Sequence, residues 1–166
     1  MVLVAVISTA LIFLIIQWEL QKRERTIRKQ RAIAVVEQLG GQWWCEPPSQ
    51  RLAIRHFLGP EYYARIEGVD LARCAMNGHG LDFLQDLTGL ATVNLSYSDI
   101  SDDDLIVVNR LRYLEYLDIR GTGVTAAGLQ VIEQMRTMKR IRCSSSLRGS
   151  EAVSRLERTN VVVEVD

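Results

Sequence analysis

The sequence is most informative in LATVNLSYSDISDDDLIVVNRLRY (residues 90–113) and LEYLDIRGTGVTAAGLQVIEQMRT (residues 114–137), two stretches that share one pattern of apolar residues. The same pattern begins earlier, in residues 66–89, and returns in residues 138–159, a unit shortened to 22 residues. Residues 160–166 repeat only the opening part. Self-similarity at a fixed period of 24 residues predicts an architecture of stacked units.

Five apolar columns run through these units. In chain order they are Val69, Val93, Leu117 and Ile141; Leu71, Leu95, Ile119 and Cys143; Met76, Ile100 and Val124; Leu81, Leu105, Leu129 and Val153; and Leu84, Val108, Ile132 and Leu156. Chance does not produce five apolar columns at one spacing. The columns therefore predict a continuous buried core that the units share.

Each unit combines two periodicities. Its opening alternates apolar and polar residues, as a strand with one buried face does. Its second half has apolar residues at i, i+3 and i+6, as one stripe of a helix does. Between the two halves, Asn77, Ser101 and Thr125 are placed to cap the helices. Strand and helix alternate along the chain, which predicts an α/β fold with a parallel sheet.

The pattern resembles the leucine-rich-repeat family in its 24-residue form. The resemblance is carried by VDLARCAMNGHGL, VNLSYSDISDDDL and LDIRGTGVTAAGL, and it covers residues 66–159. It implies a short solenoid with the parallel sheet on the concave side and helices on the convex side. In the last unit the pattern departs, because Arg148 stands in the column of Met76, Ile100 and Val124.

The N-terminal segment favours a membrane anchor. Met1 to Trp18 contains no charged side chain, and as a helix it is about 27 Å long at roughly 1.5 Å per residue, close to the bilayer core. A basic collar follows in residues 17–31, with six basic against two acidic residues. We expect Trp18, Lys22, Arg23 and Arg25 at the membrane interface. A cleaved signal peptide and a buried soluble helix are the alternatives.

These features predict four parts, with residues 1–20 as a transmembrane helix and 21–41 as the collar and a helix. Residues 42–65 are expected to cap the solenoid formed by 66–166, with a strand at Gln42 to Glu46 and a short helix at Gln50 to Leu58. The layout is similar to that of bacterial membrane-anchored leucine-rich-repeat proteins, a group without a defined activity. We expect a single-pass membrane protein with its solenoid in the cytoplasm if Met1 is the true start.

A binding surface is expected on the polar side of the strands, where residues between the apolar columns point away from the core. Two opposite charges there, Asp118 and Arg142, lie on neighbouring strands within pairing reach. A solvated face with incidental charge pairs is the alternative. The predicted binding set comprises Tyr116, Asp118, Arg120, Arg140 and Arg142, since Tyr and Arg often anchor protein contacts.

Evidence for catalysis or for bound groups is weak. The acidic triplet Asp102 to Asp104 is better explained by the first turn of a helix than by a metal. His79 and His56 have no partners at metal-ligand spacing, and the nucleotide and nucleophile motifs GxGxxG, the P-loop and GxSxG are absent. We therefore expect no enzyme activity, no metal and no cofactor. A net charge of zero gives no reason to expect a nucleic-acid partner.

Two functions remain as hypotheses. The first is a membrane-tethered module that binds a protein or peptide through the concave face. The second is a lipid-surface or structural protein in which the collar binds anionic headgroups and the repeats act as a spacer. The pair Trp43 and Trp44 fits both, as a cap over the first unit or as a contact with the membrane surface.

Overall fold

The computed structural model describes the backbone of residues 2–45 and 65–166, and side chains from Leu11 onward. The helix expected at Gln50 to Leu58 and His56 lie outside the described residues. The elements are, in chain order, α1 (Val2–Gln38), β1 (Gln42–Cys45), β2 (Ile66–Asp70), η2 (Leu81–Asp86), β3 (Thr92–Asn94), α3 (Asp104–Val108), β4 (Tyr116–Asp118), α4 (Ala126–Ile132), β5 (Arg140–Cys143), η3 (Ser145–Leu147), α5 (Glu151–Arg158) and β6 (Val162–Val165).

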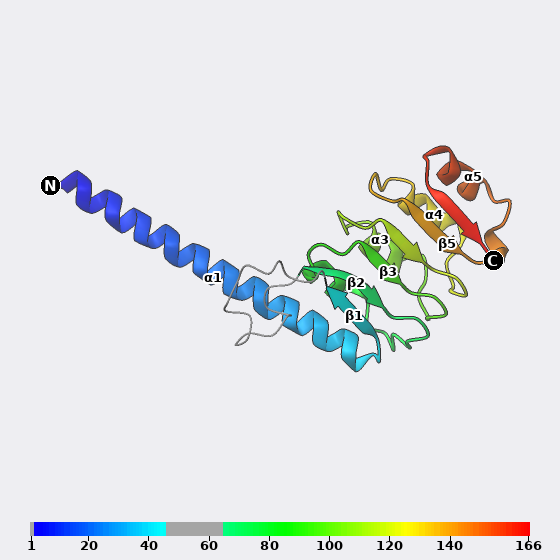
Figure 1. The fold of residues 1–166 in the computed structure, drawn as a ribbon, viewed down its shortest axis with the longest axis horizontal. Helices are drawn as coiled ribbons and strands as arrows, with labels where there is room; N and C mark the ends of the chain where they lie inside the picture. The colour runs from blue at the N-terminus through cyan, green and yellow to red at the C-terminus, as the bar shows by residue number, and fades with distance from the viewer. Residues whose placement is uncertain (1, 46–64) are drawn as a thin grey trace.

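The strands form one sheet in the order in which they occur in the chain (Figure 1). β2 to β6 are parallel, and Val93 is opposite Leu117, which is opposite Ile141. This confirms the parallel sheet and the register that the apolar columns predict. Elements η2, α3, α4 and α5 pack side by side as a second layer on the sheet, so the architecture is α/β.

The first strand departs from the parallel arrangement. α1 ends at Gln38, and Gly40 adopts a positive φ of 78°, which turns the chain back. β1 therefore enters the sheet antiparallel to β2, with Trp44 opposite Gly68. An antiparallel strand at this position closes the open edge of the first parallel strand.

The same local interactions recur at intervals of 24 residues at the ends of β2, β3 and β4. The side chains of Asp70, Asn94 and Asp118 each accept a hydrogen bond from the backbone amide two residues later, at 2.9–3.1 Å. Three residues after each of these side chains the backbone has a positive φ, at Arg73, Tyr97 and Gly121. Short Asx turns of this kind let the chain leave the sheet sharply and cross to the helical layer.

All residues of the five apolar columns are buried. In the shortened last unit the 24-residue spacing places Arg148 in an apolar column, but the buried residue is Leu147, one position earlier. Arg148 instead points outward, and its Nη2 donates to the Val165 carbonyl at 3.1 Å. The irregular unit thus keeps the core continuous at the end of the sheet.

The helix caps are confirmed at only one of the three expected positions. Thr125 Oγ1 accepts the Ala127 amide at 3.2 Å and caps α4. The expectation is wrong for Ser101, because its amide and hydroxyl donate to the Asp104 carboxylate and α3 begins later. It is also wrong for Asn77, whose side-chain amide donates a hydrogen bond to the Ala75 carbonyl.

α1 is one continuous helix with two different environments. Its C-terminal turns pack against η2 and β1, and Ala32, Ile33 and Val36 are buried there. Its N-terminal part projects away from the body (Figure 1), and Leu11 and Trp18 are more than half exposed. No boundary separates the segment expected to end at residue 20 from the helix expected to follow it.

The expected transmembrane helix is wrong. Among the described residues, the structure contains no helix with an apolar run sufficient for a membrane crossing. The expected single-pass membrane localisation is corrected with it.

Candidate functional site

A pocket of about 290 Å³ lies on the polar face of the sheet, the side opposite the helical layer. Its lining combines aromatic, acidic, amide and arginine side chains with a threonine and two aliphatic strand residues. The residues are Trp44, Asp70, Thr92, Val93, Asn94, Tyr116, Leu117, Asp118, Arg140 and Arg142. The antiparallel strand β1 contributes Trp44, and β2 to β5 contribute the rest, because equivalent positions of these parallel strands lie at roughly 4.8 Å intervals.

Trp44 forms the end wall of this polar-face pocket, and the sequence did not indicate that role. A Cβ at Gly68 would overlap the Trp44 indole, so the missing side chain is what lets the ring lie over β2. Trp43, the other half of the pair, packs against the core and donates to the Glu37 carboxylate at 3.1 Å. Trp43 behaves as a cap, whereas Trp44 belongs to the pocket. The signal available in the sequence was Gly68, the one residue without a side chain among the equivalent positions of the five parallel strands.

Charges at the C-terminal side of the face form a network different from the expected one. Arg142 donates to Glu164 at 2.5 Å, and Arg140 lies 3.5 Å from the same carboxylate. Asp118 is held by Arg120, 2.7 Å away. The expected pairing of Asp118 with Arg142 is therefore wrong, because a partner nearer in the chain and the last strand compete for the two groups.

Four of the five predicted binding residues line the pocket. Tyr116, Asp118, Arg140 and Arg142 meet there, and the Arg140 guanidinium lies 5.9 Å from the Tyr116 ring centre. Arg120 does not line it. Its guanidinium bridges Asp118 and Asp166, and these hydrogen bonds raise its pKa above the usual value. Arg120 thus positions the acids beside the pocket.

Asp70 gives the N-terminal end of the pocket an acidic character. Its Oδ1 accepts the Ala72 amide at 2.9 Å. Within the described ranges, no cation lies within 4 Å of its carboxylate. An acid next to the Trp44 indole suits a cationic group, which both the carboxylate and the ring face attract. The two ends of the pocket are thus acidic and basic respectively.

The acidic triplet has a structural role in two of its three members. Asp102 accepts hydrogen bonds from the amide and hydroxyl of Thr125, both at 2.7 Å, and so joins one unit to the next. Asp104 accepts from Ser101, while Asp103 is exposed. In the part of the chain that the structure describes, no group of three or more acidic, histidine or cysteine side chains could hold a metal ion.

The cysteines are free thiols, and Cys143 is fully buried. Burial, aided by Asp118 and Asp166, raises the Cys143 pKa from 9.0 to about 11. Because the thiol ionises more readily in the unfolded chain, its contribution to stability is complete below pH 9 and is lost as pH rises towards 11.

We therefore expect the stability difference between the protein and Cys143→Val to fall by up to about 2 kcal/mol from pH 9 to pH 11. Urea unfolding of both proteins across this range measures it. Groups other than Cys143 titrate in both proteins and cancel in the difference. A difference that is constant with pH would contradict the prediction.

The residues expected at a membrane interface lie on the exposed part of α1. Trp18 is 59% exposed, and the Lys22 ammonium lies 5.0 Å from its ring centre. Lys22, Arg23 and Arg25 are exposed as well. Binding of this collar to anionic headgroups stays a prediction.

No family model matches the chain, and no curated protein matches it. The fold and the pocket therefore define the class of protein by structure only: an α/β chain with a mostly parallel sheet and a polar pocket across the strands.

Proposed function

We propose that this chain is a non-enzymatic interaction module of the leucine-rich-repeat type, which binds a protein or peptide through the polar face of its sheet. The observation that carries the proposal is the pocket that combines Trp44, Tyr116 and Arg140 at the surface. Aromatic residues and arginine are the side chains that most often dominate the energy of protein contacts.

The charge distribution supports a peptide with a basic residue. Asp70 has a half-buried carboxylate beside the exposed Trp44 ring, and no ion pair within the described ranges satisfies it. A Lys or Arg side chain from a partner would place its charge at Asp70 and its stem against the indole. Arg140 and Arg142 already share Glu164, so an acidic residue of the partner would have to compete with that carboxylate.

A peptide library panned against the immobilised full chain tests the proposal. We expect enriched peptides to contain a basic residue and to bind Tyr116→Ala or Arg140→Ala at least tenfold more weakly, the loss of about 1.4 kcal/mol that a central contact contributes. Gly68→Ala should weaken them as well, because it displaces the Trp44 ring without removing a pocket side chain.

Arg158→Ala is the matched control for Arg140→Ala. Arg158 is exposed in the last turn of α5, in the helical layer on the other side of the sheet. Peptides should bind this variant as they bind the unaltered protein. Enriched peptides whose affinity is the same for all variants would show that the polar face is not the binding surface. Circular dichroism melting of each variant excludes loss of the fold as the cause.

A further inference from the structure

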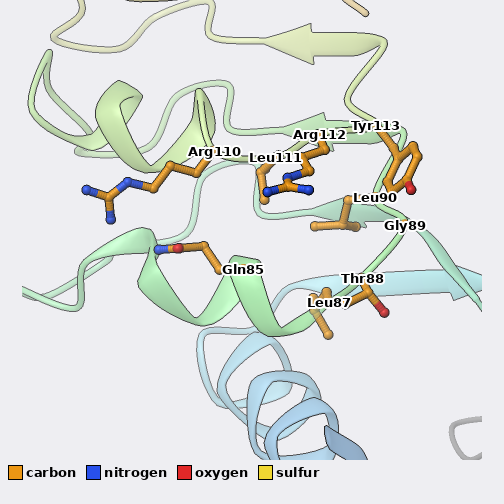
Figure 2. A pocket seen from close by; sticks show the side chains of 9 residues that line it. All are labelled: Gln85, Leu87, Thr88, Gly89, Leu90, Arg110, Leu111, Arg112 and Tyr113. Atoms are coloured by element: carbon orange, nitrogen blue, oxygen red, sulfur yellow. The ribbon is translucent and has the colours of Figure 1, made fainter.

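A second pocket, of about 380 Å³, lies where successive units meet (Figure 2). One wall is the segment from η2 to β3, and the other is the segment from α3 to β4. The nine lining residues are Gln85, Leu87, Thr88, Gly89, Leu90, Arg110, Leu111, Arg112 and Tyr113. None of them lines the polar-face pocket, so this inter-unit pocket is a separate feature.

The inter-unit pocket has an apolar floor and a polar rim. Leu87, Leu90 and Leu111 are buried beneath it. Arg110 and Arg112 are exposed at its rim, and Figure 2 shows the Arg112 side chain between those of Arg110 and Tyr113. A volume of this size suits a small ligand that buries a carbon skeleton and presents a polar group to the rim.

The rim is positively charged and lacks an internal counter-charge. No lining residue is acidic. Over the described stretches of the chain, neither Arg110 nor Arg112 has an acid within 4 Å, in contrast to Arg120, Arg140, Arg142 and Arg155. Two acids lie in the same element as Gln85: Asp82, which accepts from the Gln85 side-chain amide at 3.0 Å, and Asp86, which is half-buried.

A third arginine supports one end of the pocket. Arg65 donates from Nε to the Gly89 carbonyl at 3.2 Å, and its guanidinium lies 5.1 Å from the Tyr113 ring centre. Gly89 is required there, since its φ is 103° and a Cβ would overlap the Arg65 side chain. The stacked guanidinium holds Tyr113 at the pocket and adds a positive charge beside it.

We propose that the inter-unit pocket binds a small ligand with an oxyanion group, a phosphate ester or a carboxylate, held by Arg110 and Arg112. Guanidinium groups present paired N–H donors that match the oxygens of both anions. Thr88 and Tyr113 add hydroxyl donors at the rim, and the leucine floor receives the ligand's carbon skeleton. This site does not depend on the function proposed for the polar face.

The test is a titration of the full chain with phenyl phosphate, benzoate and benzyl alcohol, followed by backbone amide shifts in residues 85–90 and 110–113. These three probes share a ring and differ in charge. We expect saturable shifts with phenyl phosphate, with benzoate or with both, and the pattern identifies which oxyanion the site accepts. Raised salt should weaken the binding.

Variants separate this site from general attraction to a basic surface. Arg112→Gln should weaken binding roughly tenfold, and Arg110→Gln with Arg112→Gln should abolish it. Arg136→Gln is the control, because Arg136 is the exposed residue 24 positions after Arg112, on the next unit. Three results would overturn the proposal: benzyl alcohol binds as tightly as the charged probes, Arg136→Gln loses as much affinity as Arg112→Gln, or no probe gives a saturable shift.

Discussion

Val36→Asp is expected to lower the free energy of unfolding by roughly 3 kcal/mol or more, because it places a charge in an apolar contact without a partner. Val36 is fully buried where the end of α1 packs on the sheet. Its carbonyl accepts the Gly41 amide at 2.9 Å, and a Cβ at Gly41 would lie 2.6 Å from Leu71, so this junction has no space for rearrangement. Equilibrium urea unfolding gives the change directly.

Ala34→Asp is the matched control for this prediction. Ala34 lies on the same helix two residues earlier and is exposed, so the same new charge meets water. Its effect should stay within about 0.5 kcal/mol. If Val36→Asp were as stable as Ala34→Asp, the last turns of α1 would not be part of the folded body.

Asp102→Ala is expected to lower the free energy of unfolding by about 2 kcal/mol, since two hydrogen bonds to a charged acceptor are lost. Both bonds, to the amide and hydroxyl of Thr125, measure 2.7 Å, and they connect the loop before α3 with the start of α4. The Thr125 amide would be left without its acceptor, and Thr125 would lose the group that orients its cap of α4.

The neighbouring residue provides the control. Asp103→Ala removes the same charge from the same turn, but Asp103 is exposed and, in the described part of the chain, its side chain makes no hydrogen bond. We expect its thermal midpoint to change little while that of Asp102→Ala falls by several degrees. A similar fall in both variants would mean that net charge near α3, and not the bond to Thr125, stabilises this junction.

The strand positions of the binding surface could be predicted, but their pairing could not. Equivalent positions of parallel strands must lie side by side, so the 24-residue spacing already brought Tyr116 next to Arg140. Which acid each arginine contacts depends on long, rotatable side chains that choose among several partners. Asp118 had two arginines within reach, and it forms its ion pair with Arg120, the nearer one in the chain.

The transmembrane helix predicted from the sequence is also wrong. The structure contains one helix, α1, that continues without a break from the uncharged run through the charged collar, where the sequence predicted two parts. Residues 32, 33 and 36 of the same helix are buried against the sheet. The length rule considers one segment alone and has no information about such packing.

The order and direction of the parallel strands, and the burial of the five apolar columns, follow from spacing in the chain alone, because a repeated pattern of side chains can be buried only when its copies stack. The spacing brings much of the lining of both pockets together, since Leu87 and Leu111, like Tyr116 and Arg140, are 24 residues apart, but it does not determine the contacts at the ends of the pockets. β1 reverses direction and lays Trp44 over Gly68, and the loops of two units leave Arg110 and Arg112 without an acid among the described residues. Tertiary packing decides these contacts, since they depend on which surfaces meet and on which side chains are absent there.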